Sequence, residues 1–193
     1  EIFLIDRNAH EVLKFTTEGK VLLRLGNRGK PSLQAPFNSP ADVALSPSGD
    51  IYIADGYGNS IVHRFDPEGK HLSSWGERGD KPGQFTTPHG IWVDKNDRVY
   101  VADRENNRVQ IFSPEGDFIT QWGDLYHPMD IFIDSNDRVY VTDQTPRYSV
   151  FSLDGTLLDR GITPDAGHGM WGDSQGNIYL SGNTSSVAKL VKQ

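Results

Sequence analysis

Apolar and polar residues alternate along this chain in short runs that are typical of β-strands. Ile51-Tyr52-Ile53 and Val99-Tyr100-Val101 are the clearest runs, built from β-branched and aromatic residues, and an aspartate follows each within two residues. Such side chains favour the pleated surface of a sheet. Polar turns that contain glycine follow, as expected between the strands of hairpins. No stretch combines a helical period with helix caps, so the pattern predicts an all-β chain.

This strand pattern recurs with a period of about 40 residues, which is the signature of propeller blades with four short strands each. The copies at Pro40–Gly76 and Pro88–Gly123 agree almost residue for residue, and looser copies lie on both sides of them. We therefore expect a single domain, an all-β propeller over residues 1–193. Its blades are expected at residues 1–26 (partial), 40–76, 88–123, 128–161 and 168–193 (partial).

The first and last copies are incomplete, which leaves two ways to close the ring. The first copy lacks the opening strand of a blade, and the last copy lacks the final strand. In a five-bladed ring, the strands at the two ends of the chain would share one blade. Together, however, they exceed the four strands that a blade holds. This favours a larger ring, expected to have six blades, of which the chain is a part.

The composition narrows the kinds of partner and of metal ligand. The formal net charge of −7 argues against a nucleic-acid partner, which requires a basic face. No apolar run is long enough to span a membrane. The chain has no cysteine, so any metal would be bound by His, Asp or Glu. The compartment stays open: a soluble protein, secreted or periplasmic in a bacterium, is compatible with this composition.

One position of the repeat changes from blade to blade and is a candidate for a functional site. At the start of each opening strand it is occupied, in chain order, by Ala41, His89, Met129 and His168. The opening strands of a propeller surround its axis, so histidines of alternate blades can converge there. Neutral imidazoles are good ligands for zinc. The pair is therefore a candidate for metal binding; the alternative is that both histidines belong to surface turns.

Three motifs within one stretch of the chain carry a resemblance to a known family. They are Ala54–Ser60 (ADGYGNS), Pro82–Phe85 (PGQF) followed by Pro88-His89, and Ala102–Asn106 (ADREN) with Arg108 and Gln110. With these motifs and its strand-ending aspartates, the chain resembles the NHL-repeat β-propellers. Among them it is most similar to the peptidyl-α-hydroxyglycine α-amidating lyases, also called peptidylamidoglycolate lyases. Outside the motifs, only the general NHL repeat is shared.

The resemblance implies a reaction and a metal. Lyases of this family cleave a peptide that ends in α-hydroxyglycine into a peptide amide and glyoxylate, and they use a zinc ion held by three histidines on the propeller axis. His89 and His168 correspond to two of these ligands, and the third would precede Glu1. Activity as a carbon–nitrogen lyase is therefore expected only if the complete protein carries that third histidine.

Tyr57 and Arg104 correspond to catalytic residues of these lyases. The resemblance implies that the phenol of Tyr57 takes the proton of the substrate hydroxyl, and that Arg104 engages the substrate or supports Tyr57. The planar guanidinium group of arginine suits a carboxylate. Both residues also have structural alternatives. Tyr57 could cap a blade, and Arg104 could pair with a nearby acid, namely Asp55, Asp103 or Glu105.

The chain also departs from the lyases, notably at Gly169, and a second class of function stays open. Gly169 stands where the lyases have an aspartate that helps to hold a structural calcium ion, so no such calcium is expected here. The alternative function is an NHL propeller without catalysis that serves as a binding platform for protein or carbohydrate. The expected partner is accordingly a small peptide or amide substrate, or else another protein.

Overall fold

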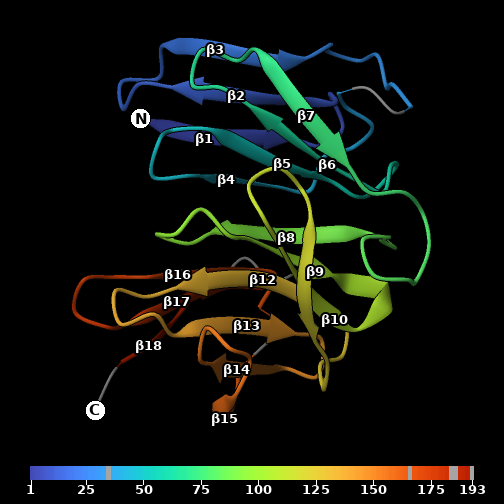
Figure 1. Ribbon diagram of the computed structural model, residues 1–193. Helices are drawn as coiled ribbons and strands as arrows, with labels where there is room; N and C mark the ends of the chain where they lie inside the picture. Colours follow the sequence, from blue (N-terminus) through green and yellow to red (C-terminus); the bar gives the residue numbers. More distant parts are fainter. Residues whose placement is uncertain (34–35, 165–166, 183–186, 192–193) are drawn as a thin grey trace.

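The computed structural model describes residues 1–33, 36–164, 167–182 and 187–191. These ranges contain eighteen strands and one short 3-10 helix, η1 (Arg104–Asn106). The strands form five antiparallel sheets that follow one another in chain order (Figure 1). The prediction of an all-β propeller with three complete and two partial blades in this chain is thereby confirmed. No helix in these ranges has the length and apolar character to cross a membrane.

Each sheet is one blade made of consecutive strands, and the first and last blades have three strands where the middle ones have four. The strands of the first and last blades are β1 (Ile2–Asp6), β2 (Glu11–Phe15), β3 (Val21–Gly26), β16 (Gly169–Gly172), β17 (Ile178–Ser181) and β18 (Val187–Leu190). Those of the middle blades are β4 (Asp42–Leu45), β5 (Ile51–Asp55), β6 (Ile61–Phe65), β7 (His71–Trp75), β8 (Pro88–Val93), β9 (Val99–Asp103), β10 (Arg108–Phe112), β11 (Phe118–Trp122), β12 (Pro128–Ile133), β13 (Val139–Asp143), β14 (Arg147–Phe151) and β15 (Leu157–Ile162).

Apolar packing between neighbouring blades forms the core. In β9, Val99 and Val101 pack in a cluster with the second blade, whereas Tyr100 and Ala102 pack in a cluster with the fourth blade. Successive side chains of a strand point to opposite faces of its sheet, so a middle blade is covered on both sides. This is why the second strand of such a blade reads as a continuous apolar run instead of a strict alternation.

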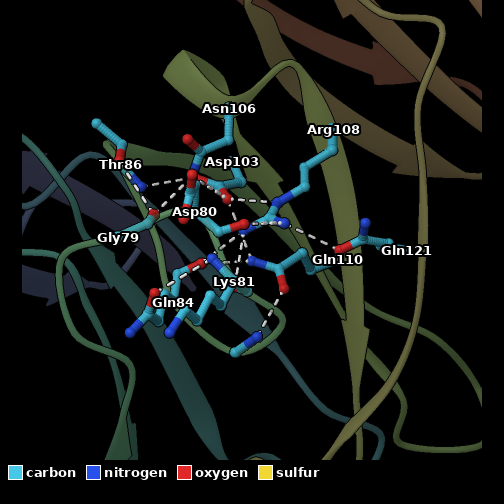
Figure 2. Close-up of polar contacts among 11 residues, drawn as sticks. Gly79, Asp80, Lys81, Gln84, Thr86, Asp103, Asn106, Arg108, Gln110 and Gln121 are labelled. Carbon is cyan, nitrogen blue, oxygen red and sulfur yellow. Dashed lines mark hydrogen bonds and ion pairs between the residues drawn. The ribbon is translucent and has the colours of Figure 1, made fainter.

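The aspartate that ends the second strand holds the loop that leads into its own blade. The carboxylate of Asp103 is fully buried and accepts a hydrogen bond from the backbone N–H of Thr86 at 2.8 Å (Figure 2). Its other oxygen accepts a hydrogen bond from Nε of Arg108, also at 2.8 Å. Asp55 and Asp143 accept the equivalent backbone N–H bonds in the blades on either side. Each loop is thus held close to the start of the innermost strand.

Two side chains of β10 also hold this loop, which connects β7 to β8. Arg108 donates to the carbonyl oxygens of Asp80, Lys81 and Gln84 (Figure 2). Gln110 also donates to the carbonyl oxygen of Gln84. Since this loop leads directly into β8, the contacts fix where β8 begins. The PGQF and ADREN motifs therefore have a structural role, which is to position the strand that carries the first of the two candidate histidines.

Two aspartates link the innermost strands of neighbouring blades. Asp42 in β4 and Asp130 in β12 occupy the same repeat position, and each accepts a hydrogen bond from the next blade. The donors are the backbone N–H groups of Ile91 at 2.9 Å and of Met170 at 2.6 Å. The blade between them has Gly90 at this position, where a Cβ would lie 2.6 Å from a backbone oxygen of the next blade. Burial raises the pKa of both carboxyls, that of Asp130 to about 6, and the charge of Asp130 raises the pKa of Asp42 further.

We expect these carboxyls to make the folded protein more stable as the pH falls from about 7.5 to about 5. Their pKa values in the folded protein lie above the unfolded value of about 3.9, so the folded state takes up protons first. The increase in stability ends at about pH 4, where the same carboxyls are also protonated in the unfolded chain. Urea unfolding at a series of pH values tests this. In Asp130→Asn, the increase in the free energy of unfolding over this pH range should be smaller by about 1–3 kcal/mol. A stability difference between wild type and variant that is independent of pH would contradict the prediction.

Candidate functional site

Two histidines from alternate blades meet at the innermost strands. His89 lies in β8 of the third blade, and His168 directly precedes β16 of the fifth blade. The centroids of their rings are 4.8 Å apart, and the ring planes meet at 78°, which is an edge-to-face contact. His89 is buried, whereas His168 is exposed. In the blades between, Met129 lies buried in β12 and Ala41 directly precedes β4.

His89 is held in one orientation and in its neutral form. Its Nδ1 lies 2.8 Å from the carbonyl oxygen of Met129, which can only accept, so Nδ1 carries the hydrogen and Nε2 has a free lone pair. Burial lowers the pKa of His89 to about 4, and the charges of neighbouring cationic groups act in the same direction. Burial also lowers the pKa of His168, followed by the charges of Arg104 and Arg7. Both imidazoles are therefore neutral at pH 7.

The hydroxyl group of Tyr57 is hydrogen-bonded to this free lone pair. Its oxygen lies 2.7 Å from Nε2 of His89, and because that nitrogen accepts, the hydroxyl donates. The two rings are edge-to-face, with centroids 5.4 Å apart. The backbone N–H of Tyr57 donates to the carbonyl oxygen of Ser39 at 3.2 Å. Tyr57 thus points across from the second blade to a histidine of the third blade.

Gly56 makes this approach feasible. It follows β5 directly, and a Cβ built on it would lie 1.8 Å from the carbonyl oxygen of Pro88, the first residue of β8. No side chain fits at such a distance, so only glycine allows the end of β5 to touch the start of β8. The consequence is that Tyr57, the next residue, reaches His89.

Arg104 lies against the ring of Tyr57 and is also paired with an acid. Its guanidinium carbon is 5.5 Å from the ring centroid. Its Nε and one terminal nitrogen both lie 2.8 Å from the same carboxylate oxygen of Glu105. The pairing with Glu105 that the sequence suggested is therefore present, while the Asp103 carboxylate is bound by Arg108. One terminal nitrogen of Arg104 has no described partner and is available to a ligand.

Arg7 is a further member of the site that we did not expect from the sequence. Its guanidinium carbon lies 4.8 Å from the centroid of the Tyr57 ring. A signal for it was present, because Arg7 follows Asp6 in the first blade just as Arg104 follows Asp103 in the third. These two blades flank the blade that carries Tyr57, so the repeat brings both arginines to the same tyrosine.

The two imidazoles supply part of what zinc requires. Zinc in catalytic sites takes three protein ligands and keeps one position open for substrate. His89 and His168 offer two neutral rings in contact, but the lone pair on Nε2 of His89 accepts the hydrogen bond from Tyr57, which a metal bound there would have to replace. Within the described ranges, no third His, Cys, Asp or Glu completes a group with them. A zinc ion bound here would need a further ligand from outside those ranges.

Known proteins share both the repeat and the motifs of this chain. The NHL repeat family matches residues 37–65 and 85–112. The peptidylglycine alpha-amidating monooxygenase of Rattus norvegicus is 40% identical over 122 residues, which is 58% of this chain and 12% of that protein. A probable peptidyl-alpha-hydroxyglycine alpha-amidating lyase of Caenorhabditis elegans is 36% identical over 125 residues, 61% of this chain and 36% of that protein. The chain thus spans only a minor part of the length of these relatives.

A solved structure supports the fold independently of the motifs. A streptogramin B lyase superposes with a TM-score of 0.73, covering 98% of this chain and 64% of that chain. At 13% identity this likeness shows the fold alone. Together, the comparisons confirm that the chain is an NHL-repeat propeller and that it resembles the amidating lyases, as its three motifs predicted.

Proposed function

We propose that this chain forms the active site of a lyase that releases glyoxylate and a peptide amide from peptides ending in α-hydroxyglycine. The observation that carries the proposal is the hydrogen bond between Tyr57 and Nε2 of His89, with His168 and Arg104 beside it. These four residues are the ones that the resemblance to the amidating lyases implies. The name of the Caenorhabditis elegans relative supports the same class of reaction.

In this proposal, His89 and His168 bind zinc together with a third ligand from outside the described residues, and the blades belong to a six-bladed ring. Zinc bound there would act as a Lewis acid on an oxygen atom of the substrate. The neutral state of both imidazoles supports this role, since a histidine must be unprotonated to bind a metal.

The residues of the chain provide the groups that the reaction needs. The substrate hydroxyl loses its proton and becomes the aldehyde oxygen of glyoxylate, while the bond between the α-carbon and nitrogen breaks. The nitrogen keeps the electron pair, takes up a proton and leaves as the peptide amide. As its phenolate, Tyr57 would take the hydroxyl proton of the substrate and then give a proton to the leaving nitrogen, acting as a general acid–base group. Arg104 binds the carboxylate of the substrate with the terminal nitrogen that Glu105 leaves free.

A pocket of about 720 Å³ next to this site offers space for the peptide part of the substrate. It is lined by the second blade and by the loops before and after that blade, and Tyr57, Trp75, Arg78 and Thr87 are among its residues. This volume is within the range that is usual for ligand pockets in proteins. Tyr57 connects the pocket to the site, so the pocket supports a substrate that extends from Tyr57 along the second blade.

Replacing Tyr57 with phenylalanine is expected to reduce kcat by about 10²–10⁴-fold, the usual contribution of a general acid–base group. The zinc content should not change, because the histidines are untouched. Release of glyoxylate from N-benzoyl-α-hydroxyglycine by the zinc-loaded, full-length protein measures the effect. Tyr179→Phe is a matched control, since its hydroxyl donates to Asp173 in the fifth blade, away from the site. Equal activity of Tyr57→Phe and wild type would contradict the role of Tyr57.

The same assay separates the proposed lyase from a binding platform. Glyoxylate release by the full-length protein with bound zinc supports the lyase. If the zinc-loaded, full-length protein releases no glyoxylate, the lyase proposal fails, and the propeller is better explained as a platform for protein or carbohydrate.

A further inference from the structure

An aspartate, a histidine and a serine are joined by hydrogen bonds across the second blade, outside the site described above. Nε2 of His63 in β6 lies 3.3 Å from Oδ2 of Asp55 in β5, and its Nδ1 lies 2.7 Å from Oγ of Ser74 in β7. Asp55 and His63 are fully buried, whereas Ser74 is exposed. The ring of Phe37 packs edge-to-face on that of His63, with centroids 5.5 Å apart. The imidazole is therefore held between a buried acid and a hydroxyl that solvent can reach.

The hydrogen-bond partners decide where the protons lie. A carboxylate can only accept, so Nε2 of His63 carries the hydrogen and, in the neutral ring, Nδ1 has the lone pair. The hydroxyl of Ser74 therefore donates to Nδ1. The same oxygen lies 2.7 Å from Nε2 of His71, and because its one hydrogen is directed at His63, His71 is the donor in that bond. His63 is thus the base that faces Ser74, and His71 is not.

The third blade shows that the fold itself does not require this arrangement. Gln110 occupies the repeat position of His63, and its amide donates to Asp103 at 3.2 Å. Opposite Gln110 in the register lies Gln121, whereas Ser74 lies opposite His63 in the second blade. An amide has no basic nitrogen, yet it serves as a partner of the strand-ending aspartate. The imidazole and the hydroxyl of the second blade therefore add a chemical property that the third blade lacks.

We propose that Ser74 is the nucleophile of a second catalytic site, a Ser–His–Asp triad that cleaves carboxylic esters. His63 is its general base, and Asp55 is the positioning residue that fixes the tautomer of the imidazole. A serine is activated in this way when it donates to a neutral imidazole whose other nitrogen donates to a carboxylate. The inference is independent of the proposed lyase reaction, because it uses neither zinc nor the histidines of the innermost strands.

A pocket next to Ser74 offers space for the acyl group of the ester. It is the pocket of about 720 Å³ that begins at Tyr57, and Ser74 is among the residues that line it. Leu33, Ile61 and Trp75 give the same pocket an apolar part. An apolar acyl group buried there would be stabilised by its removal from water. We therefore expect esters with an apolar acyl group as substrates.

The reaction balances with these groups and one water molecule. Oγ of Ser74 forms a bond to the carbonyl carbon of the ester, and its proton passes to Nδ1 of His63. The bond between that carbon and the alcohol oxygen breaks, and the alcohol leaves with this proton. Water then attacks the acyl-serine and gives a proton to His63. The carboxylic acid is released as Ser74 takes this proton back.

A fluorophosphonate probe tests the nucleophile, because it forms a bond between the serine oxygen and phosphorus and releases fluoride. Mass spectrometry of peptides from the labelled, full-length protein should place the adduct on Ser74, and Ser74→Ala should abolish it. His63→Gln should slow labelling by about 10²–10⁴-fold, the usual contribution of a general base. This variant copies Gln110 of the third blade, so it keeps a donor for Asp55 and should keep the fold, which circular dichroism checks. Hydrolysis of p-nitrophenyl acetate should fall in the same two variants.

Two further variants are controls for the triad. His71→Ala removes the imidazole that donates to the same oxygen, and it should be labelled as fast as wild type. Ser48→Ala removes an exposed serine of the same blade, whose hydroxyl is bonded to Ser46 and not to an imidazole, and it should keep the adduct. The triad is overturned if wild type takes up no probe, if the adduct lies on a residue other than Ser74, or if His63→Gln is labelled as fast as wild type. Labelling needs no zinc, so its failure leaves the proposed lyase standing, and a failure of glyoxylate release leaves the triad standing.

Discussion

Replacing His89 with alanine is expected to remove zinc and activity together. His168, which is exposed, and the third ligand would remain, and two ligands do not hold the ion with a useful affinity, since catalytic zinc takes three protein ligands. The substitution also removes the acceptor of the Tyr57 hydroxyl. Zinc content by mass spectrometry should fall to the background level, and glyoxylate release by the full-length protein should fall by at least about 10³-fold, because the metal and the partner of the Tyr57 hydroxyl are lost together.

A second histidine provides the control for this prediction. His71→Ala removes an exposed imidazole that is hydrogen-bonded to Ser74 in the second blade, outside the site. It should keep both the zinc and the activity of wild type. If His89→Ala retains a full equivalent of zinc, the ion is bound elsewhere and the assignment of His89 as a ligand is wrong. If zinc is lost but glyoxylate release persists, the reaction does not use this site.

Replacing Asp103 with alanine is expected to lower the free energy of unfolding by about 3–5 kcal/mol, the cost of leaving a buried charge without its partner. The carboxylate is fully buried and accepts hydrogen bonds from Thr86, Asn106 and Arg108. Arg108 is itself buried and would keep its charge. Urea unfolding followed by circular dichroism measures the loss, and the substitution should also loosen the loop that leads into β8.

Removing both charges should be less harmful than removing one. In the double variant Asp103→Ala/Arg108→Met, no unpaired charge is left in the interior, so part of the loss should be recovered. Asp117→Ala provides the matched control, since this aspartate is exposed and its loss should cost less than about 0.5 kcal/mol. A loss below about 1 kcal/mol for Asp103→Ala would show that the strand-ending aspartates do not hold the loops.

Several parts of this protein follow from its sequence because they depend on short-range interactions. Runs such as Val99–Ala102 and the glycine turns after them form strands and hairpins through contacts within a few residues. The blades can then be recognised, because the same pattern of strands and turns recurs along the chain. The approach of His89 to His168 could also be predicted, because equivalent positions of successive blades surround one axis.

The contacts between blades were decided only by the tertiary structure. The sequence indicated Tyr57 and Arg104 as candidates, but not that Tyr57 would bond to His89, nor that Arg104 would face the ring while paired with Glu105. Arg7 was missed because its significance depends on the blade next to it. Such contacts depend on how closely two sheets approach and on the rotamers that fit between them. At Gly56, a Cβ would lie 1.8 Å from the oxygen of Pro88. This close approach is made by two segments that are far apart in the chain, so no local pattern of residues predicts it.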